Sequence, residues 1–331
     1  MKKKKFRIVI VGGGTGLSTV LRGLKTSELL DITAIVTVAD DGGSSGRLRD
    51  DYQIPPPGDV RNVIAALSEV EPLVERMFQY RFTHSETLGG HSLGNLMLTA
   101  LTDITGDFNH AIAEMSKVFN VRGKVLPAAN ERVTLYAELQ DGSFVVGESN
   151  IPKANSKVKH VYLEPENAQA LPETIRAIRR ADVILIGPGS LYTSIIPNLL
   201  VREIGEAIVK ASGHKIYIGN LMTQKGETNN MTASDHVAAL YEHVSEPFLQ
   251  HILVNDVVLP AHIRTVYKQE QAEQLIVDED KLQAMNLHVH HYPIAAFHDG
   301  TVRHNAQNVC MWLEQFLRTH GSSRKRVLKT M

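Results

Sequence analysis

The sequence predicts an α/β protein with a doubly wound, mostly parallel, Rossmann-like sheet and a small β-rich insertion. Three observations predict this fold. An apolar strand at Phe6–Val11 runs through a glycine-rich loop into an amphipathic helix. Strand-like and helix-like segments then alternate along most of the chain, which is typical of parallel sheets. A hairpin pattern interrupts this alternation near residues 131–163, so we expect one domain over 1–331 with its α/β core at 6–130 and 173–320.

The first elements follow from apolar periodicity. After the strand Phe6–Val11, apolar residues of segment 17–24 recur at i, i+3, i+4 and i+7, the spacing of one helix face. A second strand is expected at Ile32–Val38 and ends in a polar, glycine-rich loop. After three prolines, Asp59 is predicted to cap a helix that starts at Val60. Further helices are expected at Leu73–Tyr80, Leu93–Leu101 and Ala111–Phe119.

The second half of the chain begins with the insertion on the main sheet. Asp141-Gly142 lies between two strand-like runs and predicts a hairpin turn. Alternation then resumes, without any internal repeat or low-complexity linker. The expected helices are Glu173–Arg180, Val201–Ser212, Ser234–Val244 and Asn305–Leu317, and the expected strands are Val183–Ile186, Lys215–Ile218 and Ile252–Val254.

Composition excludes several classes of protein. A net charge of −1 and a pI near 7.0 leave no basic surface for nucleic acid. No stretch approaches the ~20 apolar residues of a membrane span. Lys2–Lys5 before an apolar run resembles a signal peptide, but Arg7 and the glycines interrupt that run. The single cysteine, Cys310, is expected to be a buried, inert thiol and suits a reducing compartment, so we expect a cytoplasmic protein.

The loop Gly12–Gly16 is the strongest functional feature. Its glycines let the backbone turn tightly and approach a ligand, and the free N–H groups and dipole of the following helix favour an anion, usually phosphate. A purely structural turn is the alternative. The loop departs from the dinucleotide fingerprint Gly-x-Gly-x-x-Gly at Leu17 or Thr19, and the Walker lysine is missing. It therefore predicts binding of a nucleotide diphosphate without specifying the base.

Polar loops follow the other predicted strands, where ligands of such sheets bind. Asp40 and Asp41 end the second strand, at the usual place of a ribose-reading acid; they could instead hold Mg²⁺ or form a turn. Segment Gly187–Ser194 could form a second anion-binding helix start, although its hydroxyl groups could equally cap the helix.

Histidines show no metal-binding spacing, and no Gly-x-Ser-x-Gly elbow of a serine hydrolase occurs. His91, in the third glycine-rich helix start Gly89–Asn95, could be an acid/base or a phosphate partner, or it could be structural. His288, His290 and His291 are expected along a strand.

Six ordered motifs resemble those of the bacterial gluconeogenesis factor family (YvcK type), within the 2-phospho-L-lactate transferase (CofD-like) superfamily. The resemblance covers nearly the whole chain. The motifs are Gly12–Gly16, Ala39–Gly46, Gly58–Asn62, Gly90–Asn95, Gly187–Ile195 and Asn220–Thr228.

This resemblance implies a cytoplasmic regulatory factor required for normal cell shape and for growth on gluconeogenic carbon sources. It implies binding of a nucleotide sugar such as UDP-N-acetylglucosamine, without established catalysis, and it is compatible with protein partners in cell-wall synthesis and with a homo-oligomer. Tyr267 and Arg303 match positions that the family uses for nucleotide-sugar recognition. The candidate binding residues are Gly13, Gly14, Thr15, Gly16, Leu17, Asp40, Asp41, Ser44, Ser45, Asn62, Ser92, Asn95, Gly187, Pro188, Gly189, Ser190, Ser194, Asn220, Tyr267 and Arg303.

Two other functions stay open. The transferase relatives move phospholactate from a guanosine-diphosphate-activated donor to a deazaflavin with Mg²⁺, and their aspartates match Asp40 and Asp41. In a transferase of this kind His91 would be the candidate acid/base. The loop that starts at Gly187 differs from that of these relatives at Gly189–Tyr192, and this difference puts a deazaflavin acceptor in doubt. The third hypothesis is NAD binding, from the order of strand, glycine loop and acid alone.

Overall fold

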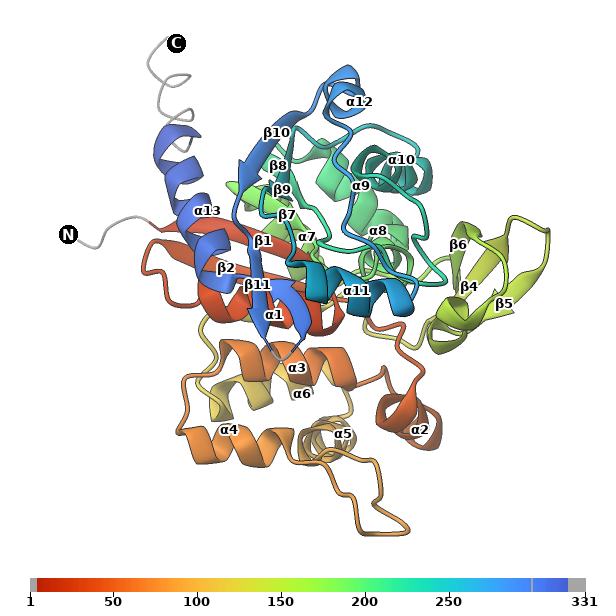
Figure 1. Cartoon of the computed structure of the whole chain (residues 1–331). Helices are drawn as coiled ribbons and strands as arrows, with labels where there is room; N and C mark the ends of the chain where they lie inside the picture. The colour runs from red at the N-terminus through yellow and green to blue at the C-terminus, as the bar shows by residue number, and fades with distance from the viewer. Residues whose placement is uncertain (1–4, 299, 321–331) are drawn as a thin grey trace.

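A seven-stranded parallel sheet forms the centre of the molecule (Figure 1). The computed structural model describes residues 5–298 and 300–320. The strands lie in the order β10-β9-β8-β7-β1-β2-β3, and every neighbouring pair is parallel. This confirms the predicted doubly wound α/β fold. The strands are β1 (Phe6–Gly12), β2 (Leu30–Val36), β3 (Lys124–Pro127), β7 (Val183–Ile186), β8 (His214–Ile218), β9 (His251–Asn255) and β10 (His288–Tyr292).

The strand order reverses between β1 and β7. From β1 the chain proceeds outward through β2 to β3, and from β7 it proceeds the other way through β8 and β9 to β10. In open α/β sheets such a reversal leaves a crevice outside the carboxyl ends of the two central strands, because the loops there diverge. All four residues of β7 are buried, as expected for a strand covered on both faces.

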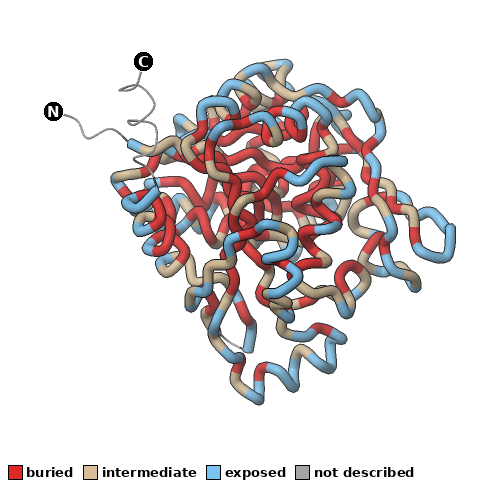
Figure 2. The backbone as a smooth tube through the Cα atoms, turned by 90° about the horizontal axis from the view of Figure 1, so that it is seen from above, coloured by how far each residue is buried: buried red, intermediate tan, exposed pale blue. Residues whose placement is uncertain are grey.

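Helices cover both faces of the sheet. On one face α1 (Gly14–Leu24) packs between α3 (Gly58–Leu67) and α13 (Ala306–His320), and on the other α7 (Pro172–Arg180) packs against α9 (Arg202–Lys210) (Figure 1). Figure 2 shows the resulting core as a continuous buried centre. The remaining α-helices are α2 (Gly43–Tyr52), α4 (Pro72–Gln79), α5 (Leu93–Thr105), α6 (Phe108–Val118), α8 (Ile196–Leu200), α10 (Ala233–Val244), α11 (Ala261–Gln269) and α12 (Glu279–Ala284).

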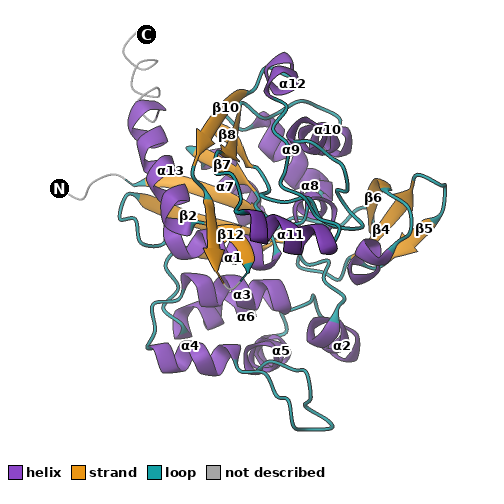
Figure 3. Cartoon of the chain, in the orientation of Figure 1, coloured by secondary structure: helices purple, strands orange, loops and turns teal. Residues whose placement is uncertain are grey.

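The predicted β-rich insertion is confirmed and forms a small sheet separate from the main one. It consists of β4 (Thr134–Leu139), β5 (Phe144–Val146) and β6 (Val158–Glu164), antiparallel in the order β5-β4-β6 and set apart in Figure 3. The predicted turn is present, with Gly142 at φ +84°. One edge of the insertion is held to α10 by His243, whose Nε2 accepts a hydrogen bond from the Val161 N–H at 3.0 Å.

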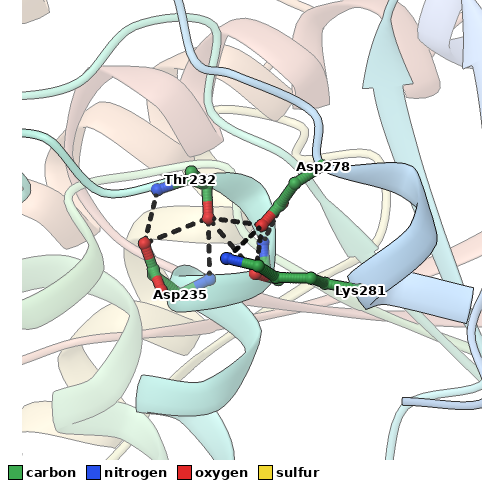
Figure 4. A network of polar contacts seen from close by, with 5 residues as sticks. Thr232, Asp235, Asp278 and Lys281 are labelled. Atoms are coloured by element: carbon green, nitrogen blue, oxygen red, sulfur yellow. Dashed lines mark hydrogen bonds and ion pairs between the residues drawn. The ribbon is translucent and has the colours of Figure 1, made fainter. Parts of the chain in front are cut away.

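The start of α10 is held by a polar network (Figure 4). Thr232 and Asp235 form a capping box. The Asp278 carboxylate, just before α12, accepts hydrogen bonds from the Thr232 hydroxyl at 2.8 Å and from the Ser234 N–H at 2.9 Å. Lys281 Nζ lies 3.5 Å from the same carboxylate. The network therefore fixes the segment that precedes β10 against α10.

Some sequence predictions need correction. Asp59 is not a helix cap: α3 begins at Gly58 after the cap position Pro57, and the Asp59 carboxylate bonds elsewhere. Residues after Asp41 were expected to be loop, but α2 begins at Gly43. The hairpin of β11 (Ala295–His298) and β12 (Thr301–His304) was not predicted. Cys310 is buried as expected, and within the described residues no helix could cross a membrane.

Candidate functional site

A cleft of about 380 Å³ opens where the strand order reverses, and we call it the β1–β7 cleft. Its walls come from the loops after β1, β7 and β8, from α11 and from the hairpin β11–β12. The cleft thus lies where a doubly wound sheet binds ligands. Of the candidate residues it brings together Gly13, Gly14, Thr15, Gly16, Pro188, Gly189, Ser190, Ser194, Asn220, Tyr267 and Arg303.

The glycine loop enters α1 without a side-chain cap. Gly14 has a φ of +64°, which favours glycine, and a Cβ on Gly13 would lie 2.4 Å from Thr37 Cγ2 and 2.6 Å from Asp59 Oδ2. One predicted feature is wrong: the Gly14 N–H is not free, because it donates to Asp59 Oδ2 at 2.8 Å. Since the first N–H groups of a helix have no intrahelical acceptor, those of Thr15 and Gly16 remain for a ligand.

Carboxyl groups with raised pKa values lie beside this loop. Burial, and then the nearby Asp40, raise the pKa of Asp59 to about 7. Burial, followed by the charges of Asp40 and Asp59, raises the pKa of Glu148 to about 8. Burial also raises the pKa of Asp40. The charges of Asp59, which accepts from the Gly14 N–H, and of Glu148 therefore change near neutral pH.

Asp40 and Asp41 point to different partners. Asp40 Oδ1 accepts a hydrogen bond from the Gly42 N–H at 2.9 Å, whereas Asp41 Oδ1 accepts one from Ser149 N–H at 2.9 Å, in the 3₁₀-helix Glu148–Lys153 of the insertion. Among the described residues no group of three or more His, Cys, Asp or Glu side chains is arranged to hold a metal. The oxygen donors of Asp40 suit Mg²⁺. Asp41 and Asp59 both lie near enough for electrostatic coupling with Asp40.

The loop after β7 departs from a simple helix start. Leu191–Ile195 forms a π-helical turn that continues into α8. Ser190 donates its hydroxyl hydrogen bond to Gln224 Oε1 at 2.7 Å, and Thr193 donates to Glu227 Oε1 at 3.0 Å. Thr193 is therefore turned away from a ligand, while Ser190 and Ser194 line the β1–β7 cleft.

Glu227 organises this wall and was not singled out from the sequence. It is only 2% exposed, and burial raises its pKa to about 7. Its carboxylate accepts hydrogen bonds from the Tyr192 N–H at 3.1 Å, from Thr193 and from Gln224 Nε2 at 2.9 Å. The only sequence signal was its place inside the motif Asn220–Thr228.

The wall of the cleft formed by α11 and the hairpin carries an aromatic ring and a cation. Tyr267 Oη accepts a hydrogen bond from the Val302 N–H at 2.8 Å, which joins α11 to the hairpin. The Arg303 guanidinium donates to Val302 O at 3.1 Å and has no ion pair within the described chain. His304 bonds to Gly219 O at 3.1 Å, and burial lowers its pKa to about 4. Arg303 is thus a free positive charge facing the cleft.

Several candidates form a separate, buried network. Asn95 donates to Ser44 Oγ at 3.1 Å and accepts from Arg61 Nε at 2.9 Å, and Ser44 Oγ lies 3.0 Å from His91 Nδ1. Ser92 caps α5. Burial lowers the pKa of His91. The candidates that do not line the β1–β7 cleft are Leu17, Asp40, Asp41, Ser44, Ser45, Asn62, Ser92, Asn95 and Gly187, together with His91.

Comparison with known proteins decides the family. A family model described as 2-phospho-L-lactate transferase CofD matches residues 8–295. The chain belongs to the CofD family. Within it, the chain is 56% identical over 315 residues to the gluconeogenesis factor of Bacillus subtilis, covering 95% of this chain and 99% of the relative. The gluconeogenesis factor of Halalkalibacterium halodurans is 55% identical over 309 residues, covering 93% and 95%.

The solved structures agree with this assignment. A crystal structure of a protein from Bacillus halodurans matches with a TM-score of 0.92 and 54% identity, covering 94% of this chain and 100% of that chain. The sequence motifs therefore identified the CofD family correctly, including the branch whose members are named gluconeogenesis factors.

Proposed function

We propose that this CofD-family chain is a regulatory protein that binds a nucleotide sugar of the UDP-N-acetylglucosamine type. The observation that carries the proposal is the β1–β7 cleft, which gathers an uncapped helix start, the ring of Tyr267 and Arg303, whose guanidinium has no ion pair within the described residues. As proposed, the protein acts in the cytoplasm on partners in wall synthesis and supports cell shape. Its relatives' name supports a role during growth on gluconeogenic carbon sources.

The residues that line the cleft suit both parts of such a ligand. The N–H groups of Thr15 and Gly16, with the positive end of the α1 dipole, favour the diphosphate. The Tyr267 hydroxyl is engaged by Val302, so its ring face is the part left for a base or sugar. The guanidinium of Arg303 adds charge-assisted hydrogen bonds to either anionic or carbonyl oxygens.

The polar lining favours binding over catalysis. Of the described residues around the cleft, His304 is the sole histidine, and it is held by Gly219 O with a pKa lowered by burial to about 4. The Ser190 hydroxyl donates its hydrogen bond to the amide oxygen of Gln224, which is not a base. These contacts leave no nucleophile with an adjacent base in the described walls of the cleft.

Calorimetry with UDP-N-acetylglucosamine tests the proposal. We expect one site per chain, and we expect Arg303→Gln to weaken binding by about 1.5–3 kcal/mol, the scale of a hydrogen bond to a charged group. Arg318→Gln, on the exposed side of α13, is the matched control and should bind like the natural protein. Absence of heat and of any thermal shift at millimolar ligand would refute the proposal.

A Mg²⁺-dependent transferase is the second candidate, favoured by one observation. Asp40 and Asp59 lie close enough beside Gly14 for the charge of one to raise the pKa of the other. A cation held there would neutralise charge on a diphosphate leaving group. The assay supplies labelled nucleotide sugars and nucleoside diphosphate donors with Mg²⁺ and cell extract as a source of acceptors. If the labelled donors stay intact, this transferase activity is excluded. A separate assay with NAD and the same extract measures absorbance at the nicotinamide band and so tests for dehydrogenase turnover.

A further inference from the structure

A second cleft, larger than the first, lies between the insertion, the loop 223–230 and the end of α11. Its volume is about 680 Å³, within the usual range for small-molecule sites. Each of the three segments contributes one lysine to the lining: Lys157, Lys225 and Lys268. We call it the lysine cleft.

The lysines give this cleft an excess of positive charge. All three are exposed, and none has an ion pair within residues 5–298 and 300–320. The carboxylates that line the cleft are Glu273 and Glu227. Glu227 already accepts hydrogen bonds from Tyr192, Thr193 and Gln224, so it does not neutralise a lysine. Three cations against one free carboxylate favour an anionic ligand.

Most of the other lining residues carry an amide or hydroxyl group, and none carries an aromatic ring. Asn229 is used internally, since it accepts from the Gly226 N–H at 2.7 Å and donates to Gln271 O. The side-chain amides of Asn155, Asn230 and Gln271 also line the cleft. Amides both donate to and accept from hydroxyl groups, whereas a nucleotide base would require an apolar or aromatic face. The chemistry matches a ligand that carries hydroxyl groups as well as negative charge.

The two clefts are separated by a single loop. Gln224 lines the β1–β7 cleft, the next residue Lys225 lines the lysine cleft, and Thr223 alone of these three borders both. The buried Glu227 anchors the loop to the wall after β7. A ligand in the lysine cleft therefore occupies space that the nucleotide-sugar proposal does not use.

We propose that the lysine cleft binds a small phosphorylated sugar as a second ligand, independent of the nucleotide site. The ammonium groups supply flexible point charges for phosphate, and the amides supply partners for the sugar hydroxyl groups. The volume of about 680 Å³ suits a small molecule.

Titration of the full-length protein with glucose 1,6-bisphosphate, followed by calorimetry and by ³¹P NMR, tests this site. We expect saturable binding at one site, weaker binding of glucose 6-phosphate and none of glucose at equal ionic strength. The double variant Lys157→Gln/Lys225→Gln should lose at least tenfold in affinity, because two of the three cations are gone. Lys210→Gln on α9, an exposed lysine outside the cleft, is the matched control.

The same titrations separate this site from the nucleotide site. Arg303→Gln should leave binding of glucose 1,6-bisphosphate unchanged, and saturating UDP-N-acetylglucosamine should not displace it. Three results would each overturn the proposal. They are loss of bisphosphate binding in Arg303→Gln, undiminished binding by the double lysine variant when its melting temperature is normal, and no binding by the natural protein at millimolar bisphosphate. Tighter binding of a phosphoserine peptide than of the sugar bisphosphate would also overturn it, in favour of a protein partner.

Discussion

At the scale of single residues, Gly14 is constrained by its backbone and not by lack of space. A Cβ there would meet only Ser194 Oγ, at 3.5 Å, whereas its φ of +64° disfavours other residues. Gly14→Ala should therefore destabilise the fold by about 1 kcal/mol through backbone strain. It should weaken nucleotide-sugar binding by about 1–3 kcal/mol, because the adjoining N–H groups move away from the diphosphate.

The chain offers a matched control for this variant. Gly142, in the exposed hairpin turn, has a φ of +84° and open space around its Cβ position. Gly142→Ala should show a similar loss of stability in urea unfolding with unchanged ligand affinity in calorimetry. If Gly14→Ala binds the nucleotide sugar as tightly as Gly142→Ala does, Gly14 is needed only for the conformation of the turn and not for ligand binding.

Asp59 and Glu148 should make nucleotide-sugar binding depend on pH. Their pKa values are raised, by burial first, to about 7 and about 8, so both lose protons as the pH rises through this range. A diphosphate diester keeps a constant charge over the same range, and new negative charge beside Gly14 repels it. Without divalent cations we expect affinity to fall from pH 6 to pH 9, by about 1 kcal/mol per carboxylate.

Calorimetry across this pH range, with variants, checks the cause. Asp59→Asn should reduce the slope of the pH profile and leave the part due to Glu148, whereas Asp41→Asn, whose carboxylate is turned toward Ser149, should not reduce it. If added Mg²⁺ reverses the slope, Asp40 and Asp59 hold the cation; a flat profile in the natural protein would contradict the electrostatic account.

At the scale of elements, strongly periodic segments were predictable from the sequence. Strand Val183–Ile186 was predicted to the residue, and α1, α7 and α10 were found within a few residues of their bounds. The helix Gly43–Tyr52 was missed because its first turn reads Gly-Ser-Ser-Gly, which is good turn chemistry. Its helical state depends on burial of Leu48 and Arg49, a tertiary contact that local sequence does not encode.

The network before α12 gives a prediction about stability. Burial raises the pKa of Asp278, but hydrogen bonds from Ser234 and Thr232 outweigh it, so the net pKa is lowered. A carboxylate with a lowered pKa stabilises the fold above its unfolded pKa of about 3.9, and this stabilisation is lost as the pH falls below that value. Asp278→Asn should therefore lower the free energy of unfolding at pH 7 by about 1–3 kcal/mol.

Urea unfolding at pH 7 and at pH 3 measures this effect. Asp280→Asn is the control, since Asp280 is exposed on α12 near the network. The difference between Asp278→Asn and the natural protein should shrink at pH 3, because the carboxyl group of the unfolded chain is largely protonated there. An equal loss at both pH values would mean that packing, and not charge, explains the role of Asp278.

At the scale of the whole molecule, the position of the site follows from topology. The glycine loop and the loop after β7 could be placed together from sequence, because both follow predicted strands. The sequence alone could not place Asp59 and Glu227 at the site, because each reaches it through a contact between distant residues. Asp59 bonds to Gly14, and Glu227 bonds to Tyr192. Ser44 and Asn95, predicted from glycine-rich motifs to bind the nucleotide, lie in a buried network outside the lining of the β1–β7 cleft.

The reversal of strand order also determines where a bound nucleotide sugar should protect the backbone. A ligand in the β1–β7 cleft contacts both halves of the sheet, and it stabilises the folded state by about 2.7 kcal/mol at a concentration of 100 Kd. Hydrogen–deuterium exchange should slow in segments 13–16, 189–194, 220–224 and 302–304, which line the cleft but are far apart in sequence. Exchange in α4 should stay unchanged, because this helix lies in the layer below the sheet (Figure 1). Protection centred on the buried Ser44–Asn95 network, with the cleft segments unaffected, would place the ligand elsewhere and contradict the cleft as the binding site.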